Sequence, residues 1–139
     1  MKYIKYSLGA LLVSSVFSMS VATAATSGYQ QYANTYSGGK STFTISSKIK
    51  EESNTQRIEA YSSSEISVSS KILNSNGSNT TTKTLSPGNT VVFSSTSDQA
   101  VSALPGTYTA QLSKTSITLT SKHIGGSWWL DKSYYDATH

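Results

Sequence analysis

The residues of this chain that could take part in nucleophilic or acid–base chemistry are few. His123 and His139 are its two histidines, and a serine nucleophile would need one of them as a base, held in place by a third group. Serines are abundant, but no G-x-S-x-G segment, which presents a serine on a sharp turn, occurs in the sequence. We therefore expect His123 to be a partly exposed structural residue. A small hydrolase that uses His123 is the weakest of three functional hypotheses.

The acidic residues do not show the pairing that glycoside hydrolysis requires. Glu51 and Glu52 share one predicted loop, whereas Asp131 and Asp136 lie near the C-terminus. The histidines are far apart in the sequence, and the segment around Asp98 lacks the several carboxylates that a calcium loop uses. The chain has no cysteine, which excludes a thiolate metal site and a disulfide framework. We therefore expect no catalytic residue, no metal site and no cofactor.

The most distinctive chemical feature is the aromatic C-terminal segment GGSWWLDKSYYDATH, which contains Trp128, Trp129, Tyr134 and Tyr135. Adjacent residues of a strand face opposite ways, so Trp128, which shares parity with Leu130, is predicted to be buried and Trp129 to be exposed. Tryptophan and tyrosine offer a large, stiff contact area with a polar group. Trp129, Tyr134 and Tyr135 are thus the predicted binding residues. The alternative is that both tryptophans cap the protein core.

The N-terminal segment has the pattern of a secretory signal peptide. Lys2 and Lys5 form a positive region, residues 8–21 are mostly apolar, and Ala22-Thr23-Ala24 is a small-residue cleavage site. A membrane anchor would need about 20 predominantly apolar residues, and serines interrupt this stretch. We expect residues 1–24 to be removed and the mature chain to be secreted and extracellular. A short signal and a cysteine-free chain favour a bacterial source.

The charge distribution argues against a nucleic-acid partner. Loss of the two signal-peptide lysines leaves nine basic and seven acidic residues, which lowers the net charge from +4 to +2. The basic residues that remain are scattered singly between Lys40 and Lys132. A nucleic-acid-binding protein would be expected to cluster them on one surface.

Alternating apolar and polar residues predict that the elements positioning these side chains are β-strands. Residues paired across antiparallel strands point to the same face, and three hairpins can be drawn in which one face is apolar. The strongest has the Asn76-Gly77 turn and pairs Val68 with Leu85. The three hairpins span residues 43–62, 68–85 and 108–121, with turns at 51–54, 76–77 and 114–115.

Residues 41–139 are predicted to form an all-β, two-sheet antiparallel sandwich of about seven or eight strands. The segment around Val91 and Phe93 is expected to be a central strand, because its aggregation-prone sequence would be hazardous at a sheet edge. The run from Ile58 to Ile72 is too long for one straight strand. A bend near Ser63 is expected to carry the chain from one sheet to the other.

The segment 25–40 precedes the predicted sandwich. Its tyrosines Tyr29, Tyr32 and Tyr36 have helical spacing, and Gly38-Gly39 would end a helix. So short a helix is marginal without tertiary packing. We therefore expect either a short N-terminal helix or a mobile tyrosine-bearing arm.

The segment TLSPGNTVVFSSTSDQAVSALPGTYTAQLS resembles the later half of secreted immunoglobulin-like sandwich domains. In those domains a "PG" turn opens one strand and a "GxYxA" stretch opens the next. The resemblance implies that the Tyr108 hydroxyl bonds to backbone upstream, as a tyrosine corner, and that Ala110 stands where other members carry a cysteine. It covers about 30 of the 139 residues and implies no particular function.

These observations favour a secreted, non-enzymatic binding protein whose partner is a cell-envelope glycan or another protein. The alternative is a bacteriocin-like antimicrobial protein, which the small size, the slight positive charge and the aromatic residues suggest. In that case a membrane surface would be a partner, because tryptophan and tyrosine favour the membrane interface.

Overall fold

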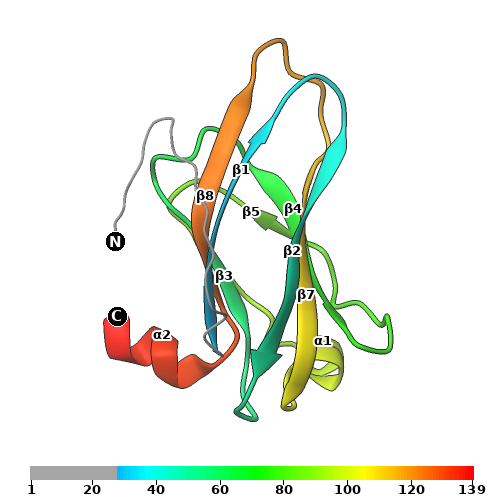
Figure 1. Ribbon diagram of the computed structural model, residues 1–139, viewed down its shortest axis with the longest axis vertical. Coiled ribbons are helices and arrows are strands. Elements are labelled where there is room, and N and C mark those ends of the chain that lie inside the picture. Colours follow the sequence, from blue (N-terminus) through cyan, green and yellow to red (C-terminus); the bar gives the residue numbers. More distant parts are fainter. Residues whose placement is uncertain (1–27) are drawn as a thin grey trace.

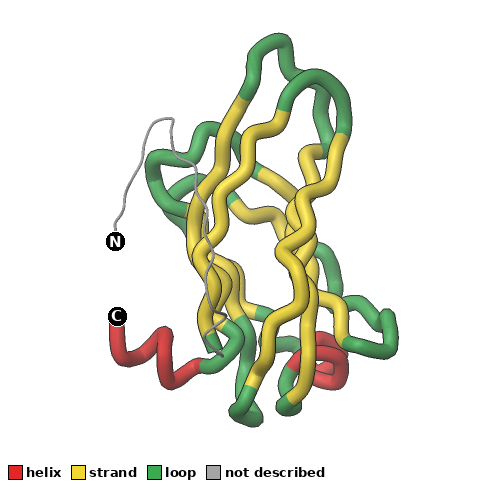
Figure 2. Tube along the Cα trace, viewed as in Figure 1, coloured by secondary structure: helices red, strands yellow, loops and turns green. Residues whose placement is uncertain are grey.

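The computed structural model describes residues 28–139, so the predicted signal peptide lies outside the described residues. Within this range two antiparallel sheets of four strands pack face to face, and two short helices lie at one end of the molecule (Figures 1 and 2). The strands are β1 (Tyr29–Tyr36), β2 (Ser41–Lys50), β3 (Arg57–Ala60), β4 (Val68–Asn74), β5 (Lys83–Leu85), β6 (Thr90–Val92), β7 (Gly106–Lys114) and β8 (Lys122–Trp129), and the helices are α1 (Thr96–Ser102) and α2 (Lys132–Thr138).

The strand order is β1-β8-β3-β6 in one sheet and β2-β7-β4-β5 in the other. First and last strands pair, as do β2 with β7, β3 with β6, and β4 with β5. The chain therefore has the topology of one long hairpin wrapped into two sheets, with β4 and β5 at its closed end. An eight-stranded, two-sheet arrangement of this kind is a jelly roll.

The predicted two-sheet antiparallel sandwich is confirmed, but its strand order is not that of an immunoglobulin domain. In the immunoglobulin order the first strand pairs with the second, whereas here β1 pairs with β8. One local feature that the resemblance implied is present: the Tyr108 hydroxyl donates a hydrogen bond to the Leu104 carbonyl at 2.5 Å. That bond depends on the turn before β7 and not on the order of the strands.

Only one of the predicted hairpins forms with its expected partner. Val68 pairs with Leu85, as the Asn76-Gly77 turn predicted. Phe43 pairs with Leu112 instead of Ser62, and β7 pairs with β2 and β4 while residues 115–121 form a loop. Alternation determines which face of a strand is buried, but any partner of matching parity satisfies it. In the predicted hairpin of residues 43–62 the buried face was right and the neighbour was wrong. In that of residues 108–121 only the β7 half faces the core, because Ile117 and Leu119 are exposed.

Neither alternative expected for residues 25–40, a short helix or a tyrosine-bearing arm, matches the structure, because residues 29–36 form strand β1 of the sandwich. A spacing of four residues suits one face of a strand as well as one face of a helix. Tyr32 and Tyr36 both point into the core, where their hydroxyls donate to the carbonyls of Glu59 (2.7 Å) and Leu112 (2.6 Å). Pairing with β8 along its whole length explains why this segment is extended.

The segment around Val91 and Phe93 is strand β6, and it lies at a sheet edge instead of the predicted centre. It is short, which limits the exposed backbone that an edge offers to other chains, and Phe93 beyond its end is fully buried. The bend expected near Ser63 is confirmed, because the chain leaves β3 in one sheet and enters β4 in the other.

Asp98, whose segment lacks the carboxylates of a calcium loop, is a buried residue in the first turn of helix α1. Its carboxylate accepts hydrogen bonds from the backbone N–H of Thr81 at 2.7 Å and from the Thr81 hydroxyl at 2.9 Å. Burial opposes ionisation, but these bonds, Ser95 and the nearby Lys83 ammonium together lower the pKa of Asp98. Within residues 28–139 no helix is long and apolar enough to cross a membrane.

The core lies between the two sheets and includes Trp128 and Leu130, which are both fully buried as predicted. The indole N–H of Trp128 donates to the Gln56 side-chain oxygen at 2.8 Å, so the ring is buried without an unsatisfied polar group. Around it pack large apolar side chains from both sheets. These include Ile45, Ile58, Ile72, Leu85, Phe93, Leu112 and Ile124.

The core assignment predicts the cost of two alanine substitutions. Phe93→Ala should lower the free energy of unfolding by about 3–5 kcal/mol, because it removes a fully buried ring. Thr44→Ala, at an exposed position of β2, should change it by only about 0.5 kcal/mol. Urea denaturation followed by circular dichroism measures both. Equal losses from the two variants would contradict the assignment of faces.

Candidate functional site

The predicted contact residues lie at one end of the β1-β8-β3-β6 sheet, on the face that points away from the core (Figure 1). Trp129, at the end of β8, is in register with Tyr29 of β1 and with Arg57 of β3. Residues in register share a face, so these three side chains form one outer cluster. The prediction that Trp128 and Trp129 face opposite ways is confirmed.

Trp129 is nevertheless buried, with 6% of its surface exposed, so the predicted exposure of this residue is wrong. The ring of Tyr29 lies 4.5 Å from it, and the rings of Tyr135 and His139 meet it edge-on at 5.7 and 5.4 Å. Its indole N–H donates to the Glu59 carboxylate at 3.3 Å. Helix α2 folds back over the outer face of the sheet and covers the ring, an arrangement that strand parity does not reveal.

The other two predicted contact residues differ in their surroundings. Tyr135 stacks on His139 with ring centroids 3.9 Å apart, and the Arg57 guanidinium lies 4.6 Å from the centre of its ring. That cation–π contact is notable because Arg57 Nε is buried without a hydrogen-bond partner. Tyr134 keeps 44% of its surface exposed and lies over Gly28, where an added Cβ would be 2.6 Å from the tyrosine ring.

A buried ion pair holds α2 in this position. Lys50 Nζ lies 3.2 Å from Asp131 Oδ1, and neither side chain has any exposed surface. The ammonium also donates to the Leu130 carbonyl (2.5 Å) and to the Asn54 side chain (2.7 Å). Burial lowers the pKa of Lys50, and the neighbouring Asp131 carboxylate opposes that shift. The ion pair thus joins the end of β2 to the start of the C-terminal helix.

The loop between β2 and β3 completes the attachment. The Asp131 carboxylate accepts the backbone N–H groups of Glu51 and Glu52 at 3.0 and 2.9 Å. In return, the Glu52 carboxylate accepts hydrogen bonds from the backbone N–H and the hydroxyl of Ser133 in the first turn of α2. The bonds from Ser133 and Asn54 lower the pKa of Glu52. Glu52 therefore caps the first turn of α2, where backbone N–H groups lack partners, whereas the Asp131 carboxylate holds the β2–β3 loop and makes no bond to the helix.

The middle of the same outer face carries a row of hydrogen-bonding side chains, which we call the tyrosine face: Tyr29, Gln31, Glu59, Tyr61 and Ser127. The Gln31 amide donates to the Tyr61 hydroxyl at 3.0 Å, and that hydroxyl lies 3.0 Å from the Ser127 oxygen. The Ser127 hydroxyl in turn donates to the Tyr29 hydroxyl at 3.5 Å. The row crosses β1 and β8 and reaches the residue after β3.

The tyrosine face is neutral except for Glu59 and is half open to solvent. Gln31 is exposed, and Tyr29 and Tyr61 are half-buried. Burial raises the pKa of Tyr29 to about 12, so its phenol stays protonated at physiological pH. Sequence analysis missed these residues because it assigned Tyr29 and Gln31 to a helix or arm. Their odd parity, opposite to that of Tyr32 and Tyr36, was the signal that could have placed them outward on a strand.

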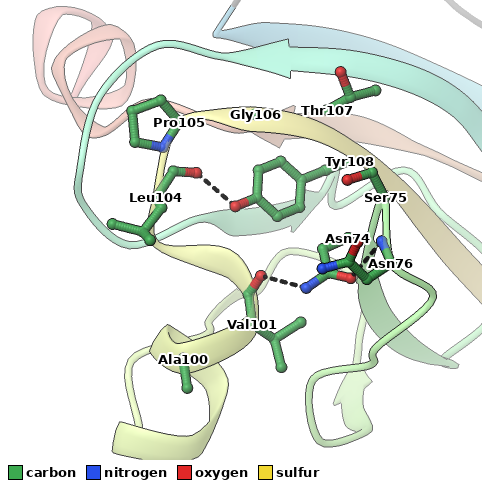
Figure 3. A pocket seen from close by; sticks show the side chains of 10 residues that line it. All are labelled: Asn74, Ser75, Asn76, Ala100, Val101, Leu104, Pro105, Gly106, Thr107 and Tyr108. Atoms are coloured by element: carbon green, nitrogen blue, oxygen red, sulfur yellow. Dashed lines mark hydrogen bonds between the residues drawn. The ribbon is translucent and has the colours of Figure 1, made fainter.

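A small pocket lies at the same end of the molecule as α1 (Figure 3). It has a volume of about 240 Å³ and is lined by residues of β4, α1 and the start of β7. The Tyr108 ring and the Asn74 amide, which donates to the Val101 carbonyl at 3.4 Å, form part of its wall. No charged side chain lines it. The pocket therefore offers neither a strong acid nor a strong base.

Each histidine lies beside a glutamate. His123 is half-buried at the start of β8, and its Nδ1 lies 3.1 Å from the Glu65 carboxylate. His139 lies 3.6 Å from Glu59 and stacks on Tyr135. Among residues 28–139, no group of three or more histidine, aspartate or glutamate side chains could hold a metal ion.

Comparison of the chain with protein-family models, with curated proteins and with solved structures finds no match.

The buried ion pair predicts unequal effects of two similar substitutions. Asp131→Asn should lower the free energy of unfolding by about 3–5 kcal/mol, because it leaves the Lys50 ammonium buried without its counter-charge. Asp136→Asn removes only the exposed ion pair with Lys132 and should cost at most about 0.5 kcal/mol. Urea denaturation of the two variants measures the difference. Comparable stability of both would show that the buried pair is not what holds α2.

The packing of Trp129 predicts that its removal frees the C-terminal helix. Trp129→Ala should cost about 3–5 kcal/mol and should speed tryptic cleavage after Lys132, which α2 otherwise protects. Tyr134→Ala, which removes a much more exposed ring, is the matched control and should change both quantities far less. Limited proteolysis followed by mass spectrometry reads out the cleavage. A Trp129→Ala protein as resistant as the parent would contradict the role given to this ring.

Proposed function

We propose that this protein is a secreted, non-enzymatic binding protein that attaches to a cell-envelope glycan through the tyrosine face. The observation that carries the proposal is the continuous row of Tyr29, Ser127, Tyr61 and Gln31, linked by contacts of 3.0 to 3.5 Å. The predicted signal peptide and the bacterial character of the sequence support a site of action outside the cell.

The chemistry of the row suits a sugar. A sugar ring presents several hydroxyls and one apolar C–H face. The tyrosine face offers phenol rings that combine an apolar body with a polar end, beside the exposed Gln31 amide, which both donates and accepts. The Ser127 hydroxyl is 2% exposed and orders the row from below. Glu59 adds a carboxylate acceptor at the edge of the row. Such a surface can exchange its internal hydrogen bonds for bonds to a ligand.

A glycan suits this surface better than a protein partner does, because the large side chains that usually anchor protein interfaces are buried here. Protein interfaces usually centre on desolvated anchors such as tryptophan, tyrosine and arginine. Here Trp128, Trp129 and Arg57 are all buried, and Tyr135 is half covered by its stacking on His139. Tyr134 is the predicted contact residue that stays open, and it extends the tyrosine face at the α2 end.

The scaffold also favours binding at this face. The side chains project from neighbouring strands of one sheet, and the hydrogen-bonded row orders them before a ligand arrives. An ordered surface loses less conformational entropy on binding than a mobile one. The Lys50–Asp131 pair keeps α2 fixed beside the row.

The test is retention of the secreted protein on insoluble peptidoglycan. Gln31→Ala and Tyr61→Ala should each weaken retention about tenfold, which is a loss of about 1.4 kcal/mol. Gln111→Ala is the matched control, because Gln111 lies on β7 in the other sheet, in register with the outward Thr44. The control should bind like the parent.

Two outcomes would contradict the proposal. One is retention that is unchanged in Gln31→Ala and Tyr61→Ala, and the other is an equal loss in Gln111→Ala. Clearing of lawns of related bacteria by the purified protein would instead favour the bacteriocin-like alternative, since a glycan-binding protein need not kill.

A further inference from the structure

A second surface lies at the opposite end of the molecule from α1 and α2 and does not belong to the tyrosine face. It consists of the loop between β1 and β2 (residues 37–40) and the loop between β7 and β8 (residues 115–121), which meet at the top of Figure 1. We call it the apolar tip. Ile117 is 77% exposed and Leu119 is 101% exposed, more than any other large apolar side chain of residues 28–139.

This exposure is built into the fold. Between the two apolar residues, the backbone N–H of Thr118 donates to the Gly38 carbonyl at 3.1 Å. The buried Lys114 ammonium donates to the same carbonyl and to the Thr118 hydroxyl, the latter at 3.0 Å. Thr118 is therefore held inward, and Ile117 and Leu119 on either side of it project into solvent. The loop is tied to its neighbour instead of being free to bury these side chains.

The charge around the tip is positive. Residues 37–40 and 114–122 contain Lys40, Lys114 and Lys122 and no acidic residue. Lys40 is exposed and Lys122 is half-buried. The carboxylate found next to this region is that of Glu65, which faces His123 below the tip. Two projecting apolar side chains thus stand among cationic groups.

We propose that the apolar tip inserts into the surface of an anionic membrane. Apolar side chains gain most when they enter the boundary between headgroups and acyl chains, and basic residues beside them are attracted to anionic lipids. The positive charge of Lys40 and Lys122 complements the negative charge of such a membrane, which favours it over other partners. The inference goes beyond glycan binding, because it uses other residues at the other end of β8.

The experiment is co-sedimentation of the secreted protein with vesicles of phosphatidylglycerol or of phosphatidylcholine. The parent should bind the anionic vesicles, and Ile117→Ser with Leu119→Ser should lower its partition coefficient at least about tenfold, because two apolar side chains are lost. Lys40→Gln with Lys122→Gln should lower binding to phosphatidylglycerol by about tenfold and should weaken its dependence on salt.

The matched control replaces exposed apolar residues at the other end of the molecule. Ile49→Ser with Leu104→Ser, at positions 56% and 65% exposed, should leave vesicle binding unchanged. Thermal melting should show that all these variants are folded, since each replaced side chain is exposed or, at Lys122, half-buried at the end of a strand. Peptidoglycan retention of the tip variants should equal that of the parent, so that the two proposals can fail separately.

Three results would overturn the proposal: a parent that does not bind phosphatidylglycerol vesicles, a tip variant that binds like the parent, or a control that loses binding equally. Light scattering tests whether a second copy of the chain, instead of a membrane, binds the apolar tip. A parent that self-associates, and dissociates when Ile117 and Leu119 are replaced, would show that a second copy of the chain covers the tip.

Discussion

The C-terminal part of this structure depends on the buried ion pair between Lys50 and Asp131. Removing two charges from water is costly, and their attraction offsets the cost only when the remaining donors and acceptors are satisfied. Here they are: the ammonium also reaches the Leu130 carbonyl and Asn54, and the carboxylate accepts two backbone N–H groups of the β2–β3 loop. The ion pair therefore fixes the start of α2 against the end of β2.

The Lys50–Asp131 pair determines which aromatic side chains of the C-terminal segment are exposed. Because it turns the chain at Asp131, α2 lies against the outer face, and Tyr135 and His139 cover Trp129. Without that turn, Trp129 would be an exposed ring at the end of a strand. With it, the ring is covered, and the side chains of the outer face that stay open to solvent include those of Tyr29, Gln31 and Tyr61. The available binding surface is consequently polar and hydroxyl-rich.

The alternation of apolar residues was enough to predict a two-sheet sandwich, the burial of Trp128 and Leu130, and the Val68–Leu85 pair next to its Asn-Gly turn. Each of these depends on parity or on a local turn. Alternation could not predict that β2 pairs with β7, because several strands have compatible parity and the partner is chosen by the whole topology. Nor could alternation predict the ion pair, since Lys50 and Asp131 are 81 residues apart and each looks like an ordinary surface charge in the sequence. The tyrosine face was missed for the same reason, because its members come from three separate strand regions.

The jelly-roll topology also determines how the two proposed surfaces relate. Strand β8 runs from the apolar tip, at Lys122, to the covered tryptophan, at Trp129, a length of about 25 Å at the usual rise of 3.3 Å per residue. Ser127 of the tyrosine face lies on this strand, and β1 and β3 flank it in one continuous sheet. A molecule whose tip touched a membrane would thus hold the tyrosine face to one side and above the lipid. A ligand anchored at the same envelope would then meet that face at a raised effective concentration, because binding at one surface makes binding at the other intramolecular. The distance between the two surfaces, which a rigid sheet and not a flexible linker fixes, would determine that effective concentration.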